Sequence, residues 1–115
     1  MPIGINWRYV DEHGHISRLT NEAYLALCGL TAEEAQVPGA LARATHPDDL
    51  PAEQALYAQL AKGEIDRFSM EKRYRHREGR VVWVAYTILR KDHPGGAFEE
   101  LSAVVYITGQ KRTTE

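Results

Sequence analysis

Hydrophobic and polar positions divide the chain into two strand-like segments, a helical middle and a strand-rich second half. Residues 7–10 and 15–19 are short segments on either side of residues 11–14, which have the sequence DEHG. Such a composition is typical of a turn, because its glycine can adopt a positive φ. The pattern therefore predicts a β-hairpin near the start of the chain.

The first part of the helical middle contains two short predicted helices. Residues 22–28 are good helix formers, with Asn21 as a preferred N-cap and Gly29 as a preferred residue just past the C-terminus. Residues 31–34 have the sequence TAEE, a capping box in which the threonine hydroxyl and the second glutamate each satisfy a backbone N–H. The second helix should stop before the Pro-Gly pair at residues 38–39.

A longer third helix is predicted to start at Pro47. A missing N–H is tolerated in a first helical turn, and the two aspartates that follow favour the positive end of the helix dipole. The helix should end at the Lys-Gly pair of residues 62–63, and it places four apolar side chains on helical spacing: Leu50, Leu56, Tyr57 and Leu60. One face of this helix is therefore expected to pack on the core.

From residue 66 the period of the pattern changes to two, which is typical of strands. The mostly apolar face of the first of these strands is interrupted by Lys72 and otherwise contains Phe68, Met70, Tyr74 and His76. Residues 81–89 are rich in β-branched and aromatic residues on both faces, and residues 101–108 form the last predicted strand. Because tight turns join these strands, we expect an antiparallel meander.

The predicted order β-β-α-α-α-β-β-β belongs to the α+β class, with a five-stranded antiparallel sheet and short helices packed on one face. The 115 residues suit a single domain. The 14 basic and 16 acidic residues nearly balance, so nucleic acid is not an expected partner, and no apolar run is long enough to predict membrane contact by this segment. Cys28 is the only cysteine, which excludes an intramolecular disulfide and favours a cytoplasmic location.

Six short motifs occur in order along almost the whole chain. They are VDEHGHI at residues 10–16, NEA at 21–23, GLTAEE at 29–34, HPDD at 46–49, EKRYRHREGRVVWV at 71–84, and IT at 107–108 with KR at 111–112. In this order they resemble the PAS sensory domain, a PAS core followed by PAC-type C-terminal strands. Where that family usually has an aspartate directly before the IT pair, this chain has Tyr106.

The resemblance implies a sensory or signal-relay module, the input domain of a bacterial signalling protein such as a sensor histidine kinase of a two-component system or a diguanylate cyclase. On this interpretation residues 1–6 are an N-terminal extension and residues 7–108 are the sensor domain. Residues 109–115 are then a linker to an effector domain on the same polypeptide, or a C-terminal tail, and Tyr106 and Thr108 carry the signal out.

Two other functions stay open beside the sensory one. The first is a small-molecule enzyme with a cavity between the helices and a curved sheet, which a buried aspartate or histidine in that cavity would favour. The second is a dimerisation module that binds no ligand. The sequence itself contains no recognisable catalytic residues, because it has neither a nucleotide-binding glycine-rich loop nor a nucleophile with an evident base.

Two sets of residues are candidates for contacts beyond the chain. A possible small-molecule pocket should lie between the helices and the sheet, with walls that could equally form an ordinary core: Tyr24, Leu27, Leu41, Leu56, Leu60, Met70, Tyr74, Val84 and Tyr86. On alternation, the other face of the strand at residues 81–89 carries an apolar stripe of Val81, Trp83, Ala85 and Leu89. We expect this stripe to pack on a second copy in a homodimer, or on a flanking helix.

The sequence leaves the identity of any cofactor unknown. Cys28 lacks the Asn-Cys-Arg motif of light-sensing relatives, and residues 52–62 contain no histidine, so a photoactive flavin–cysteine adduct and a haem are both disfavoured. His13 and His15 have no third ligand in sight, and His46 with its adjacent aspartates supplies no tetrahedral set, so no metal site is predicted. The five basic residues from position 72 to position 80 are interpreted as the solvated side of an outer strand.

Overall fold

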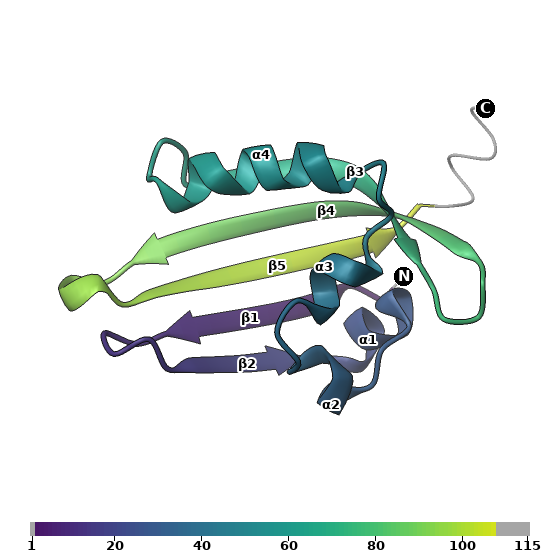
Figure 1. Cartoon of the computed structure of the whole chain (residues 1–115), viewed down its shortest axis with the longest axis horizontal. Helices are drawn as coiled ribbons and strands as arrows, with labels where there is room; N and C mark the ends of the chain where they lie inside the picture. Colours follow the sequence, from purple (N-terminus) through teal and green to yellow (C-terminus); the bar gives the residue numbers. More distant parts are fainter. Residues whose placement is uncertain (1, 108–115) are drawn as a thin grey trace.

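The computed structural model of the chain describes residues 2–107. Its five strands form one antiparallel sheet in the order β2-β1-β5-β4-β3 (Figure 1). The strands are β1 (Gly4–Val10), β2 (Ile16–Thr20), β3 (Arg67–Arg75), β4 (Val81–Asp92) and β5 (Phe98–Tyr106). The helices are α1 (Glu22–Cys28), α2 (Ala32–Ala35), α3 (Ala40–Ala44) and α4 (Leu50–Ala61), with a 3-10 turn, η1 (Pro94–Gly96), between β4 and β5. The α+β class and the five-stranded sheet are confirmed.

The helices cover one face of the sheet, called the inner face below. Figure 1 shows α4 running beside β3 and β4, while α1, α2 and α3 gather near one end of β1 and β2. The opposite side, the outer face, has no helix of the described residues packed on it. This arrangement creates two surfaces of different character on the same five strands.

Asn21 ties the first helix to the first strand. Its side-chain oxygen accepts from the backbone N–H groups of Tyr24 and Ile5, both at 2.9 Å, so it caps α1 and holds β1 with one atom. Gly29 ends the helix with φ 75°, and a Cβ at this position would lie 2.8 Å from the ring of His76. The predicted caps of α1 are therefore both present.

The second half of the helical region differs from the prediction. The helix α3 begins at Ala40, directly after the Pro-Gly pair that was expected to be only a stop. It was not predicted, because its N-cap is Gly39, which has no side chain to signal a helix start. The expected start of the long helix at Pro47 was wrong, since α4 begins at Leu50. Asp49 occupies the N-cap position, but its carboxylate binds Arg73 of β3.

Several strand boundaries also differ from the prediction. β1 begins at Gly4, within the segment that we assigned to an N-terminal extension, and Gly4 lies opposite Val104 of β5. A Cβ on Gly4 would lie 2.6 Å from Val104 and 2.8 Å from the backbone of Tyr24, so close packing explains a glycine that gives no strand signal in the sequence. β5 ends at Tyr106, and Thr108 lies outside the described residues.

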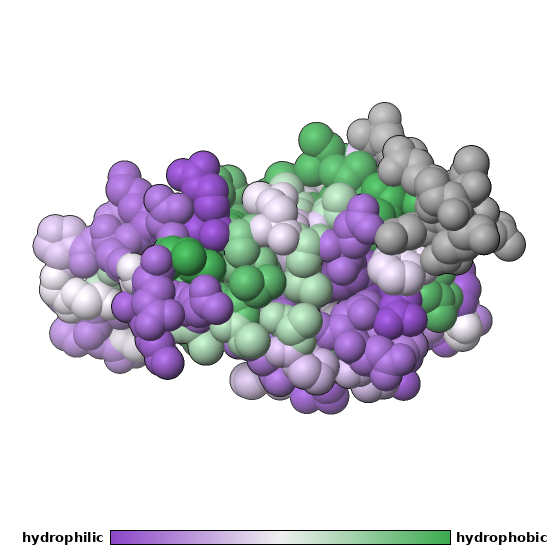
Figure 2. Space-filling model, turned by 90° about the horizontal axis from the view of Figure 1, so that it is seen from above, coloured by the Kyte–Doolittle hydropathy of each residue, from purple (hydrophilic) through white to green (hydrophobic). Residues whose placement is uncertain are grey.

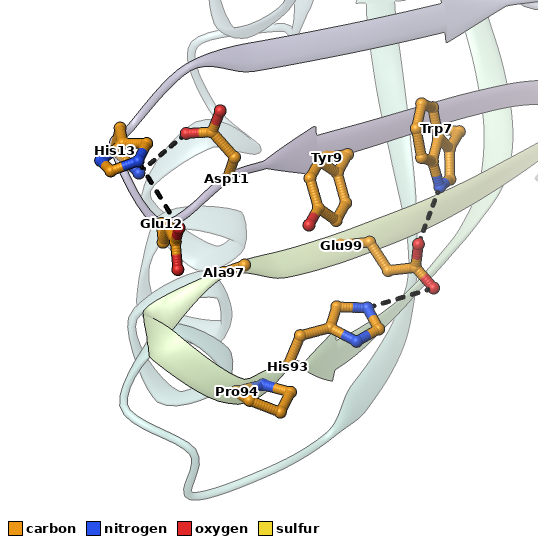
Figure 3. A pocket seen from close by; sticks show the side chains of 9 residues that line it. All are labelled: Trp7, Tyr9, Asp11, Glu12, His13, His93, Pro94, Ala97 and Glu99. Carbon is orange, nitrogen blue, oxygen red and sulfur yellow. Dashed lines mark hydrogen bonds and ion pairs between the residues drawn. The ribbon is translucent and has the colours of Figure 1, made fainter.

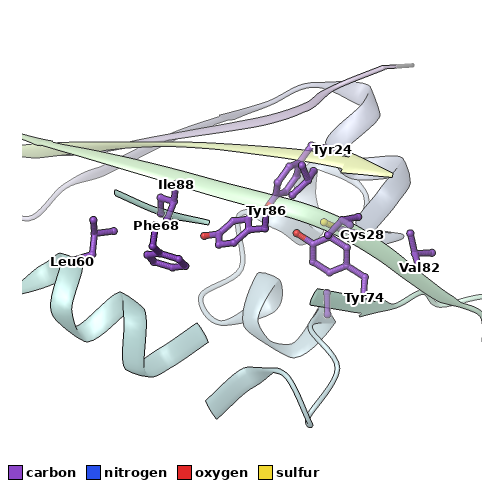
Figure 4. Packing of buried hydrophobic residues seen from close by; sticks show 11 residues of the cluster. Tyr24, Cys28, Leu60, Phe68, Tyr74, Val82, Tyr86 and Ile88 are labelled. Carbon is purple, nitrogen blue, oxygen red and sulfur yellow. The ribbon is translucent and has the colours of Figure 1, made fainter. Parts of the chain in front are cut away.

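The core lies between the inner face and the helices. The predicted alternation of β4 is confirmed, since the four residues on its inner face are all buried: Val82, Val84, Tyr86 and Ile88. Figure 4 shows Leu60 of α4 pointing toward Phe68 at one end of this cluster, and Tyr24 and Cys28 of α1 meeting Tyr74 at the other. The two helical groups therefore share one continuous apolar core.

Candidate functional site

A cavity of about 460 Å³ lies between the inner face and the helices. Its walls come from β1, β2, β3, β4 and β5 on one side and from α1, α4 and the α2–α3 region on the other. The volume falls in the usual range for a small-molecule site. Its lining is unusually polar for a domain core, with three cationic and two anionic side chains: Arg8, Arg18, Lys72, Glu53 and Glu100.

Lys72 is buried in the middle of this site. Its ammonium group donates to Glu53 at 2.8 Å and to the hydroxyl of Thr45 at 3.2 Å. It also lies 4.1 Å from the ring centre of Tyr86 and 4.9 Å from that of Tyr74, within the range of cation–π attraction. The interpretation of Lys72 as part of a solvated outer side was wrong, because its position in the strand alternation points it inward.

Glu100 of β5 is the second charged centre. Its carboxylate accepts from Arg8 at 2.9 Å, from Arg90 at 3.2 Å and from the hydroxyl of Tyr57 at 2.6 Å. Burial and the hydrogen bond to Glu100 raise the pKa of Tyr57 to about 12, so the phenol stays a donor at neutral pH. Two guanidinium groups and one hydroxyl therefore surround a single buried carboxylate.

Arg18 of β2 lines the cavity in a different way. Its guanidinium donates to the side-chain oxygen of Asn6 at 3.0 Å, and no carboxylate of the described residues forms an ion pair with it. Burial, and next the nearby charge of Arg8, lower the pKa of Arg18 from its usual value. This cation therefore lacks the anionic partner that Arg8 and Lys72 have.

The predicted pocket residues divide between the cavity and the core. Tyr24, Leu41 and Tyr86 line the cavity. The others pack in or against the apolar core: Leu27, Leu56, Leu60, Met70, Tyr74 and Val84. The charged lining residues were missed, although the interruption of an apolar face by Lys72 was a signal that could have found the first of them.

Cys28 is buried in the core, whereas His13 and His15 lie at the surface. Cys28 is 1% exposed, and burial raises the pKa of its thiol to about 11, so it is a neutral thiol packed in the core. His13 and His15 are largely exposed in the β1–β2 turn. Within residues 2–107, no group of three or more His, Cys, Asp or Glu side chains could hold a metal ion.

His46 and Asp49 connect α4 to the edge of the sheet. The backbone N–H of His46 donates to the carbonyl of Arg73 at 2.8 Å, and the carboxylate of Asp49 accepts three hydrogen bonds from Arg73. These bonds hold the pKa of Asp49 below its usual value. Arg73 also lies 4.9 Å from the ring centre of Trp83 on the outer face, so it links the helical layer to the other side of the sheet.

A second hollow lies on the outer face beside the turns. Figure 3 shows Trp7 and Tyr9 side by side on β1, with Glu99 of β5 and His93 next to them. The rings of Trp7 and Tyr9 are stacked at 6.1 Å, and the indole N–H donates to Glu99 at 3.3 Å. Glu99 also lies 3.7 Å from Nε2 of His93, a buried ring nitrogen that has no hydrogen-bond partner among the described residues.

The residues predicted for a dimer or flanking-helix contact all lie on the outer face. Val81 is 45% exposed and Leu89 is 36% exposed, and Leu101 of the neighbouring strand adds to them with 42%. Trp83 and Ala85 are half-buried between these ends. Figure 2 looks down on α4 and the β3 edge of the sheet, and in this view hydrophobic residues gather near the middle of the molecule.

A family comparison identifies this architecture. Residues 17–93 match the model of the PAS fold, which covers more than half of the chain. The chain belongs to the PAS family. This PAS domain is also 35% identical over 77 residues to the probable diguanylate cyclase DgcE of Escherichia coli, a match that covers 67% of the chain and 7% of that protein's length.

Solved structures show the same fold. The N-terminal domain of a diguanylate cyclase with a PAS/PAC sensor from Marinobacter aquaeolei superposes with a TM-score of 0.76 at 16% identity, over 94% of this chain and 98% of that one. A sensory box histidine kinase/response regulator from Burkholderia thailandensis gives 0.71 at 18% identity, over 97% of this chain and 82% of that one. None of the described helices is long and apolar enough to cross a membrane.

Proposed function

We propose that this PAS domain is the cytoplasmic input module of a bacterial signalling protein and that it binds a small molecule in the cavity on its inner face. The observation that supports this function is the cavity itself. Polar side chains from the strands and from α4 point into it, whereas an ordinary core would be filled by apolar side chains. The relatives include a probable diguanylate cyclase and a sensory box histidine kinase. An effector of one of these kinds is therefore expected on the same polypeptide.

The cavity has a direct connection to the end of the sensor domain. Glu100 and Ser102 line it from β5, and the same strand ends at Tyr106, opposite Val84. A ligand that favours one arrangement of Glu100 and its partners shifts the position of β5, and residues 109–115 pass that shift to the effector as a linker. Tyr106 and Thr108 are the proposed exit of the signal.

Dimerisation through the outer face is the second part of the proposal. Two exposed apolar side chains of β4, Val81 and Leu89, flank Trp83, and this stripe continues onto Leu101 of β5. Apolar side chains arranged in this way on a sheet face favour contact with another protein surface. We expect that surface to be a second copy of the domain.

Native mass spectrometry of freshly purified protein tests the function. Retention of a small molecule by the folded protein is the expected result, and a bare dimer would instead support a dimerisation module without a ligand. A buried aspartate or histidine in the cavity would favour the enzyme alternative. The described lining contains neither, and its two carboxylates, Glu53 and Glu100, form ion pairs with Lys72 and Arg8. Conversion of the retained molecule during incubation would nevertheless support that alternative over sensing.

A further inference from the structure

We infer that the cavity recognises a small organic anion and that the guanidinium of Arg18 binds its carboxylate or phosphate group. This inference rests on the proposed function, because it names the chemical class of the ligand for the same cavity. It depends on the balance of charges along the walls and on the place of Arg18 in the cavity.

The charges that line the cavity do not balance. Lys72 is neutralised by Glu53 at 2.8 Å, and Arg8 is neutralised by Glu100 at 2.9 Å. Arg18 is the third cationic side chain of the lining, and both lining carboxylates are already engaged with other cations. Glu100 is in addition shared with Arg90, and it acts on Arg18 only through the charge across the cavity, without a direct ion pair.

Arg18 has hydrogen-bonding capacity left for a ligand. A guanidinium group offers five N–H donors, and the bond to Asn6 uses one of them. The remaining donors form a planar fork that matches a carboxylate or a phosphate group. Asn6 is buried on β1, between β2 and β5, so the bond also fixes the orientation of the guanidinium.

The surroundings favour an anion over a cation. A cationic ligand would add positive charge beside Arg8 and Arg18, where burial and mutual repulsion already lower the pKa of Arg18. An anionic group would instead supply the missing partner. Across the cavity, Val37 and Leu41 provide apolar surface for the carbon skeleton of such a molecule.

A thermal-shift screen followed by NMR titration tests this inference on the whole chain. The probes are succinate, citrate, inorganic phosphate and glycerol 3-phosphate, each paired with a neutral counterpart such as succinamide or glycerol. We expect at least one anion to bind saturably and its neutral counterpart not to bind. We also expect Arg18→Gln to weaken that binding at least about tenfold, the loss typical of a charge-assisted bidentate contact. The carboxylate and phosphate probes distinguish the two sources of negative charge.

Arg67→Gln is the matched control, because Arg67 lies on the outer side of β3 and its side chain is 67% exposed. Equal binding by Arg18→Gln and wild type, binding of neutral probes as strong as that of the anions, or no binding of any anion would each overturn the inference. A neutral or cationic molecule retained in native mass spectrometry, together with such a result, would leave the sensory function standing. A protein that retains no molecule and binds no probe would overturn both proposals.

Discussion

The two faces of the sheet use the same strands for different purposes. On β4, alternate residues place Tyr86 in the wall of the cavity and Trp83 on the outer surface. The inner face combines an apolar core with ion pairs that are largely buried, such as Lys72 with Glu53. The outer face is open and apolar along β4 and β5, with aromatic rings on β1. A period of two thus allows one sheet to line a charged cavity with one face and to carry an exposed apolar stripe on the other.

The ion pair on the inner face should have the largest effect on stability. Glu53→Ala leaves the ammonium of Lys72 buried with only Thr45 and two aromatic rings as partners, and we expect a loss of about 3 kcal/mol in the free energy of unfolding. Lys72→Met should cost less, because the ion left without a partner is then the Glu53 carboxylate, whose side chain is 19% exposed, whereas that of Lys72 is 4% exposed. Urea unfolding measures both.

Glu64→Gln is the control for this pair, because Glu64 is exposed after the end of α4. Its free energy of unfolding should stay within about 0.5 kcal/mol of wild type. If Glu53→Ala were as mild as this control, the ion pair would not stabilise the inner face as argued.

Lys72 also shows what the sequence could and could not reveal. The order of the strands, the caps of α1 and the alternation of β4 follow from local patterns, and the structure confirms them, whereas the helix α3 was missed. The cavity depends on side chains that are distant in the sequence, such as Lys72 with Glu53 and Arg8 with Glu100. Lys72 gives a local signal because it interrupts an apolar face, but the sequence does not show that Glu53 is its partner or that Arg8 pairs with Glu100.

The predicted helix and strand boundaries were wrong for a similar reason. The start of β1 at Gly4 depends on packing against Val104, which lies at the other end of the chain. The start of α4 was misplaced because Asp49 binds Arg73 instead of continuing a helical turn from Pro47. Long-range contacts decide such boundaries, and local sequence signals do not contain them.

A substitution of Asp49 tests whether Arg73 connects the helical layer to the outer face of the sheet. Arg73 contacts both Asp49 and the ring of Trp83, so Asp49→Asn should lower the free energy of unfolding by about 2 kcal/mol at pH 7. The folded pKa of Asp49 is depressed, so its contribution is present above the unfolded pKa near 3.8 and is lost as the pH falls through the lower folded value. Unfolding measured from pH 7 to pH 2 should therefore show a weaker acid dependence in Asp49→Asn. The same acid dependence in both proteins would contradict the assignment.

A charge introduced on the outer face should change the oligomeric state of the protein more than the stability of its fold. Trp83→Glu places a carboxylate in the apolar stripe, and we expect the dissociation constant of the dimer to rise at least about tenfold. Size-exclusion chromatography with light scattering measures this change. Gln54→Glu adds the same charge on an exposed position of α4 and should leave the dimer intact. A wild-type protein that is monomeric at all concentrations would contradict the proposal that the outer face is a dimer contact.

The smallest expected effect is the loss of a single tyrosine hydroxyl, which we compare between Tyr57 of α4, on the inner side of the sheet, and Tyr9 of β1, on the outer side. Tyr57→Phe removes the hydroxyl that donates to Glu100 at 2.6 Å, and we expect a loss of about 1 kcal/mol because Arg8 and Arg90 still bind that carboxylate. Tyr9→Phe removes a hydroxyl from the outer hollow and should change the free energy of unfolding by less than about 0.5 kcal/mol. Urea unfolding of the two variants side by side measures the difference. Equal losses would show that the hydroxyl of Tyr57 contributes no more to the free energy of unfolding than the hydroxyl of Tyr9 on the outer face. The two faces would then differ in stability only through their ion pairs.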